Sequence, residues 1–323
     1  GMNMRFLKNF ELDVTYYNAK TMNQTFNPEL PVGEYARIYI QTGAVRNQGL
    51  ELALNYNNTW KDFTWNTGVT YSMNKNKILT LADNAINPIT GEKFSISSLN
   101  MGGLGSTRFI LKEGGSMGDI YSLMDLKRDA NGAVYIDENN SVVTESLEAN
   151  NYIKLGSVLP KGNLAWRNNF SWKNINVAFL VSARLGGVVF SRTQAVLDNF
   201  GVSEASAAAR DKGYVSVNGN DRVNPEGWYS VVAGGTAVPQ YYIYSATNIR
   251  LQEASIGYTI PRKWLGNVCD IKVSLIGRNL WMIYNKAPFD PESVASTDNF
   301  YQGIDYFMMP SLRNIGFNLS FKF

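Results

Sequence analysis

The side chains that most often carry out chemistry in proteins are scarce in this sequence. Its 323 residues include no histidine and one cysteine, Cys269, which excludes His-based triads, His metal sites and thiolate metal clusters. Asp290 and Glu292 flank Pro291 and resemble an acid/base pair. Neighbours in an extended segment point apart, however, and neither a nucleophile nor a base accompanies them. The sequence therefore predicts no enzyme activity and no cofactor.

A second group of oxygen-bearing side chains lies in the segment DANGAVYIDE, residues 129–138. Groups of this kind bind hard cations such as Ca²⁺. The members are Asp129, Asn131, Asp137 and Glu138. Their spacing does not match a complete EF-hand loop, and Asn-Gly between strand-like flanks is typical of a hairpin turn. We therefore expect a small hairpin around residues 129–132 and no metal site.

Aromatic side chains gather in one long polar stretch. Flat rings in a loop can stack on sugars or contact a partner protein, because loops carry function on rigid scaffolds. The candidates for substrate contact are Trp228, Tyr229, Tyr241 and Tyr242. Packing within the loop itself is the alternative role for the same residues.

The elements that must position these residues are long β-strands. In the last strand apolar and polar residues alternate strictly, with the apolar set at Ile315, Phe317, Leu319, Phe321 and Phe323. A strand of this length can cross a bilayer at a tilt, for which ~9–11 residues are needed. An edge strand of a soluble sandwich alternates in the same way. This strand alone does not choose between the two.

The same alternation predicts about eight strands in an all-β, antiparallel, up-and-down arrangement. They cover about residues 5–17, 35–57, 63–74, 163–172, 175–185, 246–260, 269–282 and 310–323. Very short turns alternate with long loops, of which the longest are about 75–162, 186–245 and 283–309. A transmembrane barrel has short periplasmic turns and long extracellular loops, whereas a soluble sandwich has no reason to separate them. If the short turns are periplasmic, the alternation of short and long connections puts the end of the last strand in the periplasm.

Side chains on these strands fit a membrane barrel. Aromatic residues suited to an interfacial girdle end several strands, namely Trp60, Trp172, Trp281 and Tyr284. Charged residues on the polar strand faces are the candidates for lining the lumen: Arg184, Arg250, Glu253, Lys272 and Arg278. Facing lipid near the midplane, such side chains would cost ~2–4 kcal/mol. They would line the pathway, hold a plug, or pair with neighbouring lumen charges.

Several other classes are excluded by composition. Thirty basic and 27 acidic residues give a net charge of +3 with no basic block, so nucleic acid binding is not expected. No run approaches the ~18 apolar residues of a spanning helix. The first residues, GMNMRFLKNF, lack a charged region followed by an apolar one and do not predict a secretion signal. An exported protein would have its beginning elsewhere.

At this point the sequence resembles a known family. Several segments together resemble the C-terminal part of the SusC/RagA class of TonB-dependent outer-membrane transporters. They are residues 45–78, GGVVFSRTQAVLDNFGVS at 186–203, ATNIRLQEASIGYTIPRKW at 246–264, VSLIGRNLWMI at 273–283, DPES at 290–293, and the terminal MPSLRNIGFNLSFKF. Phe323 likewise resembles the C-terminal aromatic that the barrel-assembly machinery recognises.

The resemblance implies both a function and its limits. It implies a barrel of about 22 strands around an N-terminal plug, in the outer membrane of a Gram-negative cell. Such proteins import glycan or peptide fragments with a SusD-like lipoprotein lid and the TonB complex. Residues 1–323 would be a C-terminal barrel portion without plug or N-terminal strands, unable to transport alone. Its two terminal strands would need partners, because unpaired edges cannot face lipid.

A soluble β-rich module, possibly glycan-binding, is the competing hypothesis. It predicts that Ile315, Phe317 and Leu319 are packed inside the protein. The barrel predicts that they face outward into lipid. The sequence does not identify the substrate.

Overall fold

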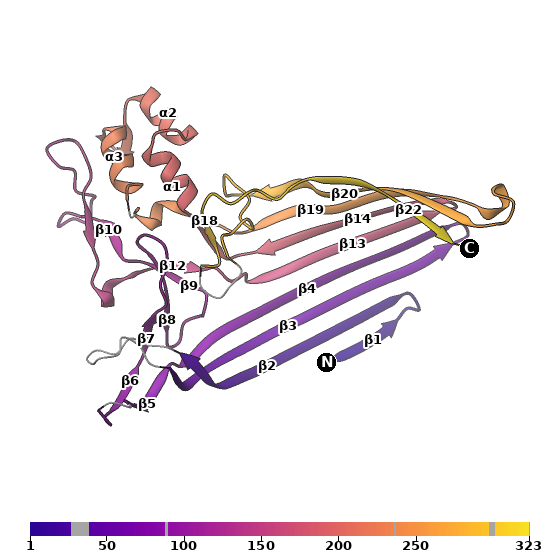
Figure 1. Ribbon diagram of the computed structural model, residues 1–323, viewed down its shortest axis with the longest axis horizontal. Coiled ribbons are helices and arrows are strands. Elements are labelled where there is room, and N and C mark those ends of the chain that lie inside the picture. The colour runs from indigo at the N-terminus through magenta and orange to yellow at the C-terminus, as the bar shows by residue number, and fades with distance from the viewer. Residues whose placement is uncertain (27–38, 88–89, 236, 297–300, 323) are drawn as a thin grey trace.

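The alternating segments form one antiparallel sheet of nine strands in a computed structural model, which describes residues 1–26, 39–87, 90–235, 237–296 and 301–322 (Figure 1). Every neighbour in the sheet is also the next of these strands along the chain. The order is β1 (Met2–Phe6), β2 (Phe10–Phe26), β3 (Ile40–Trp60), β4 (Phe63–Thr80), β13 (Gly162–Trp172), β14 (Ile175–Leu185), β19 (Asn248–Ile260), β20 (Asp270–Asn285) and β22 (Asn314–Lys322). The predicted all-β, up-and-down antiparallel fold is confirmed.

The sheet has nine strands where the sequence predicted about eight. Residues 5–17 were expected to form a single strand, but the chain reverses at residues 7–9 between β1 and β2. Leu7 and Lys8 there adopt left-handed conformations, with φ of 49° and 62°. Phe6 pairs with Phe10 across the turn, and their rings stack at 5.4 Å. The apolar period therefore continues through the reversal, and no glycine or proline marks the turn.

Connections of two different kinds separate at the two ends of the sheet (Figure 1). At one end, hereafter the turn end, only 2 residues join β3 to β4 and β13 to β14, and the 3₁₀ helix η3 (Arg262–Trp264) lies between β19 and β20. At the other end, hereafter the loop end, residues 81–161, 186–247 and 286–313 connect the strands. The sheet thus carries nearly all of its additional structure at one end.

The two faces of the sheet differ in chemistry, because each strand alternates and the register aligns the alternations. One rung of paired residues on the apolar face runs Met4, Leu12, Leu54, Val69, Trp166 and Val181. Most of its side chains stay exposed, at 38% for Val69 and 41% for Trp166, whereas Leu12 and Val181 are half-buried. Ile315, Phe317 and Leu319 lie on the same face and are exposed as well. They are not packed inside, as the soluble sandwich required.

Residues 81–161, 186–247 and 286–313, as far as they are described, fold together beyond the loop end; we call them the loop assembly. Its largest sheet joins β7 (Ser98–Asn100), β8 (Thr107–Lys112), β9 (Asp119–Ser122) and β12 (Ile153–Ser157). A second joins β15 (Val188–Ser191), β18 (Ile243–Ser245) and β21 (Ile304–Asp305). Strand pairs are β5 (Ala82–Ile86) with β6 (Lys93–Ile96), β10 (Met124–Leu126) with β11 (Thr144–Ser146), and β16 (Val215–Val217) with β17 (Asp221–Val223). Short 3₁₀ helices are η1 (Ala149–Asn151) and η2 (Pro239–Tyr242).

The loop assembly contains the main apolar core of the described chain. Phe109, Phe190 and Ile304 come from three different loops, and each is at most 1% exposed. Ser191 and Asp305 add a buried hydrogen bond of 2.6 Å between the second and third loops. The long loops are therefore one packed unit.

Three short helices lie within the second loop, where none was predicted. They are α1 (Arg192–Asn199), α2 (Glu204–Lys212) and α3 (Pro225–Val232). Each begins with a capping side chain, Ser191, Ser203 or Asn224, that accepts a hydrogen bond from a backbone amide of the first turn. No helix in the described residues has the length and apolarity needed to cross a membrane.

Candidate functional site

All five charged candidates lie on the polar face of the sheet. Arg184 is the last residue but one of β14, at the loop end, and pairs with Asn248 of β19. Glu253 pairs with Leu180 on one side and Arg278 on the other. Lys272 lies nearer the turn end, opposite Ser320 of β22. The strands therefore bring onto one surface the residues that alternation had assigned to it.

Glu253 and Arg278 form a cross-strand ion pair on that surface. The Arg278 Nε donates to Glu253 Oε2 at 2.9 Å. The side chain of Glu253 is 40% exposed and that of Arg278 is 66% exposed. At such exposure, water and salt screen the attraction, and a pair of this kind contributes ~0.2–1 kcal/mol. This pair can tune the charge of the surface without holding the fold together.

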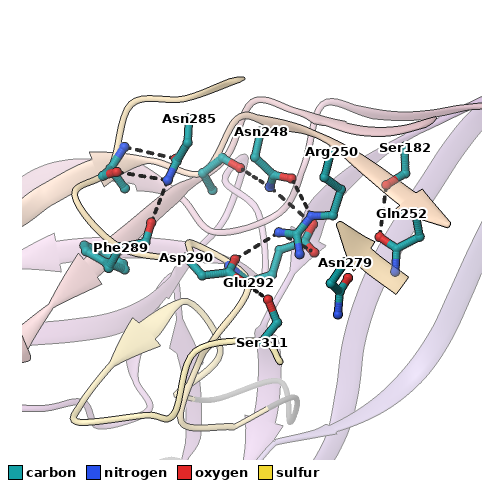
Figure 2. A network of polar contacts seen from close by, with 12 residues as sticks. Ser182, Asn248, Arg250, Gln252, Asn279, Asn285, Phe289, Asp290, Glu292 and Ser311 are labelled. Atoms are coloured by element: carbon teal, nitrogen blue, oxygen red, sulfur yellow. Dashed lines mark hydrogen bonds and ion pairs between the residues drawn. The ribbon is translucent and has the colours of Figure 1, made fainter. Parts of the chain in front are cut away.

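Arg250 instead lies in a buried network at the loop end (Figure 2). Its guanidinium contacts Asp290 Oδ1 at 2.9 Å and Glu292 Oε2 at 3.1 Å, and its Nε donates to Asn248 Oδ1 at 3.2 Å. The side chains of Arg250 and Asp290 are only 6% and 9% exposed. Asn248 Nδ2 also donates to Glu292 Oε1 at 3.3 Å. The segment Asp290–Glu292 is thus fixed to the first residues of β19.

Opposing effects act on the Asp290 carboxyl. Burial favours the neutral acid, but hydrogen bonds from Ser311 and Arg250 favour the carboxylate, and the net result lowers the pKa of Asp290 below its ordinary value. Asp290 is therefore ionised at neutral pH. Its role is to hold the third loop against the sheet, which agrees with the sequence-based rejection of an acid/base pair.

A hollow of about 490 Å³ opens on the polar face beside this network. Arg184 lines it from β14, while Asp13 and Glu51 line it from β2 and β3. Arg184 donates from Nη2 to the Val158 carbonyl at 2.7 Å, whereas its buried Nε has no partner within the described residues. Glu292 also borders the hollow. The hollow therefore has acidic groups on the side of β2 and β3, and both a guanidinium and Glu292 on the other side.

The aromatic candidates are distributed between the core and the surface of the loop assembly. Trp228 packs edge-on against Tyr241 at 5.2 Å between ring centroids and borders the apolar core. Tyr241 is 39% exposed, whereas Tyr242 is 2% exposed. The Tyr242 hydroxyl donates to Asp198 Oδ2 at 3.0 Å. Substrate contact is therefore the wrong role for Tyr242, since its ring is part of the core.

Burial and charge shape the titration of these tyrosines. Burial first, and then the Asp198 carboxylate, raise the pKa of Tyr242 well above its ordinary value. The same two causes, in that order, raise the pKa of Tyr244 to about 12. Asp198 is 5% exposed and also accepts from Gln194 Nε2 at 2.8 Å. These contacts place the Asp198 side chain among hydroxyl and amide donors.

Tyr229 faces a second hollow, which sequence reasoning missed. This hollow measures about 530 Å³ and is bounded by the three helices, including Asp198, Arg210 and Glu226. A signal for it existed in the sequence: Ser203, a run of helix formers and Gly213 are typical of a capped helix. The helices that enclose the hollow were therefore predictable, although their packing against one another was not.

The oxygen-rich segment 129–138 forms turns. Asp129 Oδ1 accepts from the Asn131 and Ala133 amides at 2.8 and 2.9 Å, and Asp137 Oδ1 accepts from the Asn139 and Ser141 amides at 3.0 and 2.9 Å. Residues 128 and 134 bridge across the first turn, as the predicted hairpin requires. The described residues contain no group of three or more metal-ligating side chains. Phe323, the predicted assembly signal, lies outside the described residues.

No family model matches the chain. The sequence does match two individual proteins from Formosa agariphila. TonB-dependent receptor P3 is 26% identical over 364 residues, and TonB-dependent receptor P26 is 27% identical over 335 residues. The first match covers 100% of this chain and 33% of the relative, the second 96% and 32%. The chain is thus similar, over nearly its whole length, to two TonB-dependent receptors. It spans about a third of the length of these curated relatives.

Solved structures have the same fold as this chain. The RagAB peptide transporter superimposes with a TM-score of 0.69 at 15% identity, over 98% of this chain and 34% of that one. The RagAB peptide importer in its open-open state gives 0.68 at 16% identity, over 98% and 33%. At these identities the likeness establishes the fold.

Proposed function

We propose that this chain is a wall segment of an outer-membrane importer. The observation that carries the proposal is the continuous apolar face of the nine-stranded sheet, with charged residues on the opposite face and a packed loop assembly at one end. Lipid would cover the apolar face, and the polar face would look into the lumen. The stretch Leu164–Trp172 of β13 has 9 residues, within the ~9–11 residues that a tilted strand needs to cross a bilayer.

In this proposal the loop assembly lies outside the cell and the short turns lie in the periplasm. Trp228, Tyr229 and Tyr241 are then available to the substrate or to a SusD-like lipoprotein. Arg184, Arg250, Glu253, Lys272 and Arg278 belong to the lumen wall. The cargo would be an oligosaccharide or a peptide fragment, and the similarity to a peptide transporter supports the peptide.

TonB would supply the energy for import. The proposed mechanism is capture of the substrate outside, followed by rearrangement of a plug. The nine strands alone would not transport, because β1 and β22 each pair on one side only within the described residues.

Accessibility in intact cells tests the orientation. In the whole protein, Phe200→Cys places a thiol on the loop assembly and Trp264→Cys places one at the turn end, where the native side chains are 74% and 64% exposed. A membrane-impermeant maleimide should label Phe200→Cys in intact cells and Trp264→Cys only after permeabilisation. Cys269 is buried, so the unsubstituted protein is the blank. Equal labelling of both variants in intact cells would refute the proposal.

Uptake tests the function itself. Labelled peptides and labelled oligosaccharides are supplied to cells with and without the gene for the whole protein. Import of one class should require both the gene and an intact TonB system. Import that persists without TonB would contradict the proposed energy source.

A further inference from the structure

Three cationic side chains form a continuous cross-strand row near the loop end of the sheet. Lys20 of β2 pairs with Arg46 of β3, and Arg46 pairs with Lys77 of β4. Neighbouring strands lie about 4.8 Å apart, so the row is about 10 Å wide at the backbone. Lys75 follows on β4, in the adjacent rung opposite Gln48. We call Lys20, Arg46, Lys75 and Lys77 the cationic cluster.

The cluster projects from the apolar face, not from the polar one. Along each strand its members are separated from apolar-face residues by an even number of positions. On the same face, the next rung toward the turn end after that of Lys75 contains Tyr16, Leu50 and Met73, which pair across the same three strands. Tyr16 is 63% exposed and Met73 is 37% exposed. The cluster therefore lies just beyond the apolar band, on the surface that the proposed function assigns to the membrane.

Within the described residues, no side chain neutralises the positive charges of the cluster. None of the four residues takes part in an ion pair within the described part of the chain. The Nε of Arg46 is buried and has no hydrogen-bond partner there. Like charges directly opposite on neighbouring strands destabilise a sheet. A bound anion would relieve this repulsion.

We propose that the cationic cluster binds the phosphate group of an anionic lipid headgroup in the outer leaflet. An arginine fork flanked by lysines suits a phosphate, because the fork donates two parallel hydrogen bonds and the ammonium groups add charge. The exposed strip at Tyr16, Leu50 and Met73 then receives the acyl chains. This inference rests on the proposed function, since it places the loop end at the outer surface of the membrane.

A lipid accounts for the cluster better than a free phosphate ion does. A free anion needs only the charges, whereas the apolar strip directly below them matches a molecule that has both a phosphate and a hydrocarbon tail. Basic groups near a membrane surface each contribute about fivefold to binding of anionic lipid. Four of them form an anchor that also fixes the depth of the wall in the bilayer.

Lipid titration of the whole protein in neutral detergent tests the inference. The probes are lipid A carrying its phosphates, lipid A stripped of them, and inorganic phosphate alone, and native mass spectrometry counts the bound molecules. Arg46→Gln should weaken binding of phosphorylated lipid A about fivefold, and the triple variant Lys20→Gln, Arg46→Gln, Lys77→Gln about 100-fold. Lys272→Gln on the polar face and Lys263→Gln at the turn end remove the same charge and should leave binding unchanged.

Thermal unfolding without added lipid shows whether the variants fold. Removing like charges relieves repulsion, so Lys77→Gln should be at least as stable as the unsubstituted protein in neutral detergent. A lower Tm for Lys77→Gln would show an internal partner and overturn the inference. Equal binding of the two forms of lipid A would overturn it too, as would full occupancy of the cluster by inorganic phosphate alone. Binding in detergent needs no transport, so a failure to import would leave the inference standing.

Discussion

Val69 and Phe109 are both large apolar residues in β-strands, yet Val69 in the sheet is 38% exposed and Phe109 in the loop assembly is 0% exposed. The difference holds for the two regions as wholes. The sheet turns its apolar side chains outward, and the loop assembly packs them inward around residues from all three long loops. Each pattern matches its own solvent: lipid for the strands and water for the loops.

The comparison shows that one chain can hold two parts with different sources of stability. Strand pairing and the match to a bilayer would stabilise the sheet, whereas burial of apolar area stabilises the loop assembly. Arg250 lies where they meet and ties the third loop to β19 (Figure 2). Substitutions should therefore act on one part and spare the other.

The largest effect is expected from the loop core. Phe109→Ala removes a fully buried ring and should destabilise the loop assembly by ~3–5 kcal/mol. Limited proteolysis of the whole protein should show faster cleavage within the three long loops, while the heat-induced gel shift of the barrel stays the same. Phe109→Leu, which keeps most of the apolar volume, is the matched control. If Phe109→Ala both speeds cleavage of the loops and abolishes the gel shift, the two regions unfold as one.

A charge on the apolar face should affect the sheet alone. Val69→Arg places a guanidinium toward lipid and should cost ~2–4 kcal/mol in refolding into bilayers. Thr70→Arg, one residue along β4, adds the same group on the polar face and should cost much less. Denaturant titration of the two proteins in liposomes gives both values. Equal costs would show that the two faces of the sheet do not face different solvents.

Regular alternation is what made the sheet predictable from the sequence. In β22, the pattern at Ile315, Phe317 and Leu319 determines both the strand and its faces, because side chains in a strand have a period of 2. The turn between β1 and β2 was missed because Leu7 and Lys8 take left-handed conformations that such residues seldom adopt. Local pattern thus predicts strands better than it predicts reversals without glycine.

The site was predictable only in part, for a different reason. Alternation placed Arg250 on the polar face, but its partner Asp290 is 40 residues away, and no periodicity encodes that contact. Tyr242 looked like a surface aromatic because its segment is rich in tyrosine. Its burial depends on Asp198, 44 residues earlier in the chain. Long-range packing decides such roles, and it lies beyond what a local pattern specifies.

Alkaline pH should destabilise the loop assembly moderately. Burial raises the pKa of Tyr244 to about 12 and that of Tyr242 further, while an unfolded tyrosine ionises near 10. Above about pH 10 the unfolded state binds fewer protons, so each such tyrosine lowers the stability of the loop assembly by about 1.4 kcal/mol per pH unit. This stability is fully present below about pH 10 and is lost as the pH rises through the folded-state value.

Tyr242→Phe tests that assignment. At neutral pH it should cost ~1.5–3 kcal/mol, because Asp198 loses a hydrogen bond. Above about pH 10 the variant should lose stability less steeply than the unsubstituted protein, by one tyrosine's share of about 1.4 kcal/mol per pH unit. Tyr135→Phe is the control, since its ring in the same assembly is 40% exposed. Identical slopes for all three proteins would place Tyr242 in contact with water.

The smallest effect should come from the exposed pair on the polar face. A double-mutant cycle with Glu253→Gln and Arg278→Gln should give a coupling of ~0.2–1 kcal/mol that falls as salt is added. The same cycle on Arg250 and Asp290 should give a larger coupling that salt changes little, because both side chains are less than 10% exposed. Urea unfolding of the four proteins in each cycle measures both values. A Glu253–Arg278 coupling as large and as salt-resistant as that of Arg250 would mean that water does not reach the polar face, and the lumen assignment of that face would then fail.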